Sequence, residues 1–191
     1  MEYIHYTQTP LGGVLLASDG EALTGLWFEG QKHFAESLGK ERAERDLPVF
    51  RETETWLAAY FAGEDPGFLP KLRPRGTAFQ MRVWDLLLTV PFGKTVTYGE
   101  LAARLGEGSP RAVGGAVGRN PISLLIPCHR VLGAGGCLTG YAGGLERKVF
   151  LLALEVTSKN ASPALRRSFC PSLSCKNLKA TKDSCVFCPS I

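Results

Sequence analysis

The segment LLIPCHRV, residues 124–131, places Cys128 directly before His129 and sets the pair between a proline and an arginine. A buried structural thiol packs as a small hydrophobic side chain and needs no base beside it. A nucleophilic thiol reacts as the thiolate, and a nearby base or cation lowers its pKa. The pair therefore indicates nucleophilic chemistry, and the rest of the chain decides whether it is more than a chance neighbourhood.

The local geometry of the pair leaves two arrangements open. Neighbouring side chains on an extended chain point to opposite sides, which makes a direct hydrogen bond between Cys128 and His129 difficult. Either the backbone bends after Pro127, or a water molecule bridges the thiol and the imidazole ring.

The first 75 residues predict a small α/β unit. Three short segments alternate apolar and polar residues between glycine-containing turns and predict a three-stranded antiparallel sheet, at residues 3–9, 13–18 and 22–28. The next stretch repeats bulky apolar side chains at helical spacing and predicts a helix that ends at Gly63. Proline and glycine then accumulate up to residue 76, which predicts a linker. We therefore expect one domain at residues 1–75 and a second at residues 76–156.

The second domain is predicted to be mainly helical. Thr77 and Gln80 form a capping-box pattern ahead of a helix that closes at Pro91, and a second box, Thr97 with Glu100, precedes LAARLG. The loop after Cys128, GAGGCLTGYAGG, lacks the Gly-Lys-Ser/Thr ending of a P-loop, so we expect it to bring its backbone close to a different ligand.

Two short helices in this domain are joined by a tight turn, in which Ser109 can cap a helix that begins at Pro110. The spacing fits a helix-turn-helix and a plain helical hairpin equally well. Glycines at positions 114, 115 and 118 favour the helix-turn-helix, because they allow close approach to another backbone.

Charge and cysteine content divide the chain into a body and a tail. The whole chain carries +4, but the residues after Glu155 hold six basic side chains against one acid, so residues 1–155 sum to −1. Any affinity of the body for nucleic acid must therefore come from a local patch and from shape. The body has only Cys128 and Cys137 and is not a disulfide framework, so we expect reduced thiols. No apolar stretch approaches the ~20 residues of a membrane span and the start lacks a signal-peptide pattern, which predicts a cytoplasmic protein.

Residues 157–191 are rich in serine, lysine and proline and predict a disordered basic tail. The tail holds C-x4-C and C-x2-C spacings, but the first is loose and no apolar pattern supports a fold around it. We expect no metal site there and none elsewhere in the chain.

The motifs RAVGGAVGRNPISLLIPCHRV and GYAGGLERKVFLLALE closely resemble those of the methylated-DNA–protein-cysteine methyltransferases, or O6-alkylguanine-DNA alkyltransferases. The resemblance covers about residues 1–155 and is densest from Phe79 onward. It implies a ribonuclease-H-like α/β domain followed by a helical domain that carries the helix-turn-helix. It also implies a DNA repair protein that flips O6-alkylguanine out of the duplex and transfers the alkyl group irreversibly to its own cysteine.

The resemblance assigns roles to particular residues. Cys128 would be the nucleophile and alkyl acceptor, His129 its base through a water molecule, Glu155 the group that orients His129, and Asn120 the residue that holds the active-site turn. The residues expected to contact substrate or DNA are Tyr98, Gly99, Arg111, Gly114, Val131 and Ala142. Arg111 would fill the space that the flipped nucleotide leaves, and Tyr98 would contact the purine. The carbonyls of Cys128 and Val131 and the amide of Ala142 would read the guanine edge.

The resemblance further implies a monomer without a cofactor, acting on double-stranded DNA, with O4-alkylthymine as a minor substrate and no membrane partner. A eukaryotic member would be nuclear. Zinc-binding members of the family carry cysteines near the N-terminus, whereas residues 1–75 here have none and only His5 and His33. Two alternatives stay open. One is a non-catalytic sensor of alkylated DNA, which the presence of Cys128 disfavours. The other is a cysteine hydrolase built on Cys128, His129 and Glu155.

Overall fold

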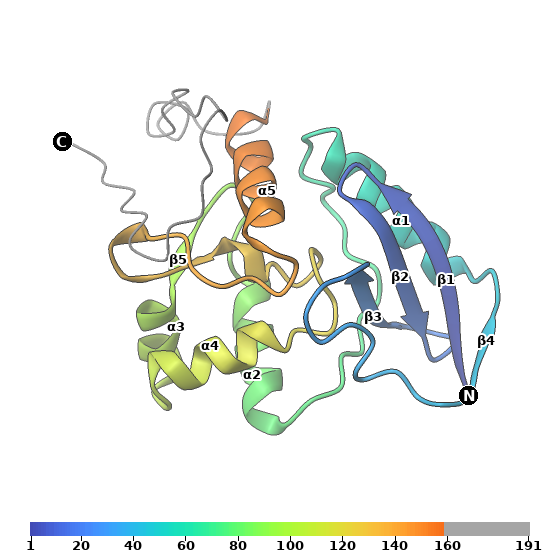
Figure 1. Cartoon of the computed structure of the whole chain (residues 1–191), viewed down its shortest axis with the longest axis horizontal. Helices are drawn as coiled ribbons and strands as arrows, with labels where there is room; N and C mark the ends of the chain where they lie inside the picture. The colour runs from blue at the N-terminus through green and yellow to red at the C-terminus, as the bar shows by residue number, and fades with distance from the viewer. Residues whose placement is uncertain (159–191) are drawn as a thin grey trace.

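The computed structural model describes residues 1–158. Figure 1 shows two halves side by side: a sheet with helix α1 (Pro48–Phe61) along it, and a group of helices that contains the remaining long elements. The tail predicted from residue 157 starts later than expected, because Thr157 is the last residue of α5 (Leu145–Thr157) and Ser158 is buried. The rest of the predicted tail, with its four cysteines, lies outside the described residues. Within residues 1–158, no helix is long and apolar enough to cross a membrane.

The sheet contains the three predicted antiparallel strands and one more. Strands β1 (Glu2–Thr9), β2 (Gly12–Ser18) and β3 (Leu23–Phe28) pair in sequence order, and β4 (Arg42–Glu44) pairs in parallel with β1. The prediction of three strands is therefore wrong by this edge strand. Strand β4 has only three residues, two of them exposed charged side chains, so it carries no apolar alternation that the sequence could reveal.

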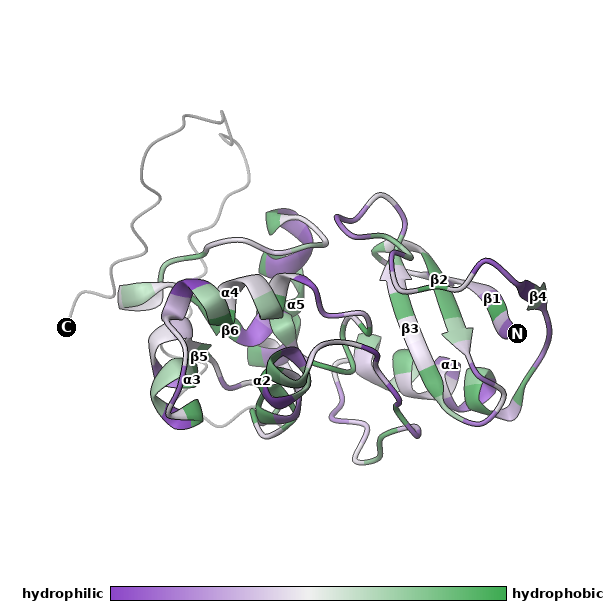
Figure 2. Ribbon diagram, turned by 90° about the horizontal axis from the view of Figure 1, so that it is seen from below, coloured by the Kyte–Doolittle hydropathy of each residue, from purple (hydrophilic) through white to green (hydrophobic). Residues whose placement is uncertain are grey.

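Both faces of the sheet are covered, by different parts of the chain. One face of β2 and β3 joins a large apolar cluster with helix α1 and with residues of the helical half. The opposite face forms a small cluster around Leu15 and Trp27, against Ala35 and Leu38 of the following loop. The apolar colouring of β2 and β3 in Figure 2 agrees with strands that are buried on both sides.

The helical half begins with α2 (Ala78–Leu88) and includes α3 (Tyr98–Leu105), α4 (Pro110–Gly118) and α5 (Leu145–Thr157). The capping boxes of Thr77 with Gln80 and of Thr97 with Glu100 are both formed. Ser109 caps α4 through the Ala112 amide, as predicted. Helices α3 and α4 pack on each other and on α2, so the two short helices form the expected helix-turn-helix unit.

A second, two-stranded sheet positions the residues around Cys128. Strand β5 (Val96–Thr97) pairs in parallel with β6 (Val131–Leu132), through Val96 with Val131 and Thr97 with Leu132. Strand β5 leads directly into α3, and β6 directly follows the 3₁₀ turn η1 (Cys128–Arg130). This pairing therefore places the start of α3 beside Cys128.

The two halves are joined by backbone hydrogen bonds as well as by the shared core. The Leu26 amide donates to the Pro121 carbonyl (2.9 Å), and the Ser123 amide donates to the Leu26 carbonyl (2.9 Å). Strand β3 thus extends its pairing to the segment that leads to Cys128. Buried Gln31 adds a side-chain link, because its Oε1 accepts from the Phe28 amide (2.9 Å) and bonds with the Ser123 hydroxyl (3.1 Å).

Candidate active site

The Cys128 thiol lies in a bent, buried segment. The backbone bends into the 3₁₀ turn η1 directly after Pro127, but the bend brings no direct hydrogen bond between Cys128 and His129: among the described residues Nδ1 of His129 has no partner and Nε2 faces Glu155. Upstream, Leu124 adopts a left-handed conformation (φ 70°), which is unusual for a branched residue and costs conformational energy. Cys128 is 3% exposed, so a reactant must enter the protein to reach it.

Asn120 holds this segment through both ends of its side-chain amide. Its Oδ1 accepts from the Ile122 amide (3.0 Å), and its Nδ2 donates to the Ile126 carbonyl (2.8 Å). The same Nδ2 lies 3.1 Å from the Cys128 sulfur and donates to it. Asn120 therefore holds the turn, as the resemblance implies, and also stabilises negative charge on the sulfur, which was not predicted.

Competing effects act on the acidity of the thiol. Burial raises the pKa of Cys128, because the thiolate loses its hydration. The Asn120 amide, the positive charge of Lys148 and the backbone amides of Cys128 and His129 lower the pKa, but burial outweighs them. Cys128 is therefore a protonated thiol at rest and needs a base to become a nucleophile.

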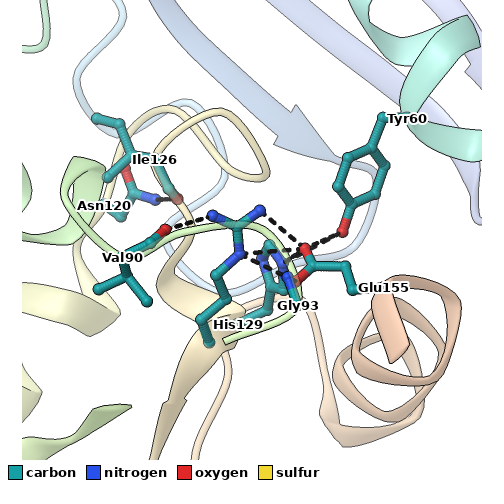
Figure 3. Close-up of polar contacts among 8 residues, drawn as sticks. Tyr60, Val90, Gly93, Asn120, Ile126, His129 and Glu155 are labelled. Carbon is teal, nitrogen blue, oxygen red and sulfur yellow. Dashed lines mark hydrogen bonds and ion pairs between the residues drawn. The ribbon is translucent and has the colours of Figure 1, made fainter. Parts of the chain in front are cut away.

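His129 and Glu155 form a buried pair (Figure 3). Helix α5 places Glu155 on the same buried face as Lys148, Leu151 and Leu152, at helical spacing. The His129 Nε2 lies 2.7 Å from Glu155 Oε1. Because a carboxylate only accepts, Nε2 carries the proton and Nδ1 holds the free lone pair of the neutral ring. Nδ1 is buried and has no hydrogen-bond partner among the described residues, so it is the nitrogen available to accept a proton.

Glu155 is surrounded by donors from separate parts of the chain. Arg130 donates to both carboxylate oxygens through Nε (3.1 and 3.0 Å) and to Oε1 through Nη2 (3.0 Å). The Gly93 amide donates to Oε2 (3.0 Å), and the Tyr60 hydroxyl of α1 donates to Oε1 (2.7 Å). Arg130 is itself held by the Val90 carbonyl, which accepts from Nη1 (2.7 Å). The carboxylate is therefore fully satisfied and fixed in orientation.

These contacts determine the charge states of the pair. Burial alone would raise the pKa of Glu155, but the charges and hydrogen bonds of His129 and Arg130 lower it to about 2. Burial lowers the pKa of His129 and outweighs the opposing attraction of Glu155. The resting site thus contains an ionised Glu155, paired with Arg130, and a neutral His129.

Lys148 is a fully buried cation near the thiol. Its ammonium donates to the Val131 carbonyl (2.5 Å) and the Thr139 carbonyl (2.7 Å), and it lies 3.5 Å from the Gly140 carbonyl. Burial lowers the pKa of Lys148 to about 8, while the nearby Cys128 opposes the shift. Lys148 therefore ties β6 to the glycine-rich loop and adds positive potential at the sulfur.

A cavity of about 180 Å³ opens onto Cys128. Its walls come from α3 and α4, from the glycine-rich loop and from the β3–β4 loop of the sheet half, where the Lys32 amide donates to the Ala142 carbonyl (2.9 Å). The Tyr141 hydroxyl is buried without a partner among the described residues. The lining residues are Lys32, His33, Tyr98, Gly114, Val117, Gly118, Cys128, Gly140, Tyr141 and Ala142.

The structure brings most of the predicted contact residues to this cavity or to its rim. Tyr98, Gly114 and Ala142 line it. Gly99 and Arg111 lie next to it on a more open, mainly apolar groove of about 500 Å³ that Tyr98 and Gly114 share. Val131 is fully buried in β6 and lines neither the cavity nor the groove. Both carbonyls expected to read guanine already have a partner: that of Cys128 accepts from the Val131 amide, and that of Val131 accepts from Lys148. Each carbonyl retains a second lone pair.

Three residues of the site, Tyr60, Arg130 and Lys148, are not predicted from the sequence. Lys148 could have been found, because it lies seven residues before Glu155 on the apolar stripe of α5 and a charged residue there must have partners. Tyr60 lies on the buried stripe of α1, where its hydroxyl also needs a partner. Neither pattern identifies the partner of the buried polar group. For Tyr60 the partner is Glu155, 95 residues later in the chain.

A ribonuclease-like sheet domain, a helical domain with a helix-turn-helix and a buried Cys–His–Glu arrangement together define a class of DNA-alkyl transfer proteins. The family description "6-O-methylguanine DNA methyltransferase, ribonuclease-like domain" matches residues 3–72, and "6-O-methylguanine DNA methyltransferase, DNA binding domain" matches residues 78–157. The chain belongs to the methylated-DNA–protein-cysteine methyltransferase family.

Relatives and solved structures agree with this assignment. The methylated-DNA–protein-cysteine methyltransferase of Haemophilus influenzae is 46% identical over 156 residues, which are 80% of this chain and 86% of the relative. The crystal structure of Mycobacterium tuberculosis OGT in complex with DNA superposes with a TM-score of 0.73 at 45% identity, covering 80% of this chain and 92% of that one. An O6-methylguanine DNA methyltransferase from Methanococcus jannaschii has a TM-score of 0.56 at 30% identity, covering 79% and 92%.

Proposed function

We propose that this protein repairs DNA by transferring the alkyl group of O6-alkylguanine to Cys128, once per protein molecule. The observation that carries the proposal is the arrangement around the sulfur. A protonated, buried thiol lies at the base of a cavity, with a neutral imidazole, an ionised carboxylate and an amide donor fixed around it. The DNA complex of the M. tuberculosis relative supports DNA as the partner.

The proton and the alkyl group move in opposite directions. His129 Nδ1 accepts the proton of the Cys128 thiol through a bridging water, and Glu155 holds the resulting imidazolium at Nε2. The thiolate attacks the alkyl carbon, the bond from that carbon to O6 breaks, and its electron pair stays on guanine. The imidazolium proton returns to the guanine anion. The products are S-alkylcysteine and an unmodified guanine, so atoms and charges balance.

Access to the reacting carbon requires base flipping. The carbon lies inside the duplex stack, and Cys128 lies inside the protein, so the nucleotide must rotate into the cavity at a cost of a few kcal/mol. Arg111, exposed at the start of α4, occupies the space that the nucleotide leaves, while Tyr98 contacts the purine from the cavity wall. The proposal also covers the organisation and location of the protein. The boundary between its two domains lies near residue 75, and the protein acts as a monomer. Because its substrate is DNA, it works in the cytoplasm of a prokaryote or in the nucleus of a eukaryote.

The acid–base groups around the sulfur do not cleave a thioether, which is why each molecule acts once. The decisive experiment is mass spectrometry of the protein after incubation with duplex DNA that contains O6-methylguanine. We expect a gain of one methyl group per molecule, located on Cys128. Cys128→Ala should show no gain, while the matched variant Cys137→Ala should be methylated like the wild type.

Other outcomes distinguish the alternatives. Binding to the alkylated duplex without a mass gain would mean a sensor that leaves the lesion intact. Repeated turnover of an activated ester would mean a cysteine hydrolase. Methylation on Cys137 would refute the assignment of Cys128.

A further inference from the structure

Tyr60 reaches the His129–Glu155 pair from the other half of the molecule. It lies on α1, which packs on the sheet, whereas His129 and Glu155 belong to the helical half. Its hydroxyl donates to Glu155 Oε1 (2.7 Å) and lies 3.2 Å from His129 Nε2 (Figure 3). Tyr60 is fully buried, so water does not replace these contacts.

The ring of Tyr60 is held firmly enough to impose a position on its partners. It stacks on Trp56 with ring centroids 5.1 Å apart, and it meets the edges of Phe61 and Phe92 at 5.6 and 5.7 Å. Such aromatic contacts restrict the ring to one orientation. The hydroxyl is therefore a fixed point against which the Glu155 carboxylate is placed.

The Glu155 carboxylate needs such a fixed point because Arg130 competes with His129 for it. Arg130 donates to both oxygens and would be satisfied by a carboxylate turned symmetrically toward the guanidinium. Only Oε1 of the carboxylate faces His129. Besides Arg130 and His129, the donor that binds this oxygen is the Tyr60 hydroxyl. The Gly93 amide holds Oε2 on the other side.

The hydroxyl also has a lone pair free for the imidazole. Because its proton points to Glu155, its oxygen lone pairs are available to the Nε2–H of His129. In the resting site Arg130 already balances the charge of Glu155. When His129 accepts the thiol proton it becomes positively charged, and a carboxylate already balanced by Arg130 stabilises that charge less than a free carboxylate would. The Tyr60 oxygen is a second acceptor for the Nε2 proton and adds to the stabilisation.

We propose that Tyr60 is a positioning residue for alkyl transfer: its hydroxyl keeps Glu155 Oε1 directed at His129 and shares the Nε2 proton, so that the sheet domain helps to form the Cys128 thiolate. The inference rests on the proposed function. It gives α1 a part in the reaction beyond support of the fold.

The test compares Tyr60→Phe, which removes only the hydroxyl, with Thr53→Val on the same helix. Thr53 is also fully buried, but its hydroxyl donates only to the Val49 carbonyl of its own helix. Single-turnover transfer from free O6-benzylguanine is measured from pH 6.5 to 9.5, at a temperature where all variants are folded by circular dichroism. Loss of a hydrogen bond to a charged group predicts that Tyr60→Phe is about ten- to a hundredfold slower near pH 7. Thr53→Val should match the wild type.

The pH profile separates positioning from a folding defect. Arg130 and Lys148 act on His129, Arg130 and Tyr141 act on Tyr60, and Cys128 is the neighbouring thiol. The pKa of Lys148 is lowered to about 8, so Lys148 titrates within the measured pH range in the wild type and in Tyr60→Phe alike. As pH rises, solvent deprotonates the thiol without His129, so the deficit of Tyr60→Phe should shrink. A deficit that stays constant at every pH, or a wild-type rate at neutral pH, would overturn the role of Tyr60.

A double-mutant cycle with Glu155→Gln provides a second test. Because Tyr60 acts in part through the carboxylate, adding Tyr60→Phe to Glu155→Gln should slow transfer by a smaller factor than Tyr60→Phe does in the wild-type protein; the contact with His129 accounts for the loss that is left. A full additional loss in that background would overturn the proposal. The proposed function and the role of Tyr60 can fail separately. If the wild-type protein transfers no alkyl group, both the function and the role of Tyr60 are refuted. If the wild type transfers the group and Tyr60→Phe does so at the same rate, only the role of Tyr60 is refuted.

Discussion

Glu155 is a buried carboxylate that stays ionised because Arg130 and His129 surround it. Arg130, which directly follows the Cys–His pair in the sequence, contributes three of the six hydrogen bonds to the Glu155 carboxylate among the described residues. A buried ion pair contributes little net stability compared with apolar residues of the same size, but removal of one partner is costly. The stability of the protein should therefore depend on this carboxylate, and the dependence should follow pH.

Glu155→Gln is predicted to lower the free energy of unfolding by about 3–5 kcal/mol at pH 7, because Arg130 would remain buried without its counter-charge. The folded-state pKa of Glu155, about 2, lies below the ordinary value of 4.5. The contribution of the carboxylate is therefore complete above pH 4.5 and is lost as pH falls toward 2. Denaturant unfolding from pH 7 to 2.5 should show the gap between wild type and variant closing over that interval.

Glu146→Gln is the matched control for this prediction, since Glu146 lies on the same helix but is exposed. It should follow the wild-type curve at every pH. The lowered pKa of His129 adds a separate loss of stability below pH 6.5, because the unfolded chain takes up a proton that the folded one resists. That loss is the same in the wild type and Glu146→Gln and larger in Glu155→Gln, which lacks the carboxylate that raises the His129 pKa. A gap for Glu155→Gln that does not change with pH would contradict the ionised state of Glu155.

At the scale of elements, the features that could be predicted from the sequence are those formed by residues close together in the chain. The capping boxes at Thr77 and Thr97 and the cap at Ser109 are local patterns, and each is formed. Strands β4, β5 and β6 have two or three residues and are held by pairing between distant segments, so no local pattern announces them. In the site, the resemblance predicted Cys128, His129, Glu155 and Asn120, while the long-range contacts of Tyr60 could not be read from its spacing.

Helix α4 is the element expected to separate recognition of duplex DNA from the chemistry. Its first turn exposes Arg111 beside the groove that adjoins the cavity. Arg111→Ala is predicted to slow transfer from O6-methylguanine in duplex DNA at least tenfold, because under the proposed function the flipped-out state would lose the group that occupies the vacated space. Transfer from free O6-benzylguanine needs no flipping and should stay within about twofold of the wild-type rate.

Single-turnover assays on both substrates measure the difference. Arg51→Ala removes an exposed arginine from α1, in the sheet half, and should leave both rates unchanged. Equal losses on the two substrates with Arg111→Ala would indicate damage to the fold of α4 and would contradict the role of Arg111 in flipping.

At the scale of the whole molecule, the two halves share one apolar core. Residues of β2, β3 and α1 belong to the same buried cluster as residues of α2, α4 and α5. Backbone hydrogen bonds from Leu26 and the buried hydroxyl of Tyr60 cross between the halves as well. Unfolding either half alone would expose the apolar surface of the other and leave buried polar groups without partners, so partial unfolding is unfavourable.

The protein is therefore predicted to unfold in one cooperative transition, although chains with two domains often do not. Its three tryptophans report on both halves, since Trp27 and Trp56 lie in the sheet half and Trp84 in α2. A Trp27→Phe/Trp84→Phe variant retains only Trp56, and a Trp27→Phe/Trp56→Phe variant retains only Trp84. In each variant, the midpoint in denaturant by fluorescence should coincide with the midpoint by circular dichroism. A fluorescence midpoint for Trp56 below that of the helical signal would mean that the sheet domain opens first, and the contact of Tyr60 with Glu155 would then be lost before the helical site unfolds.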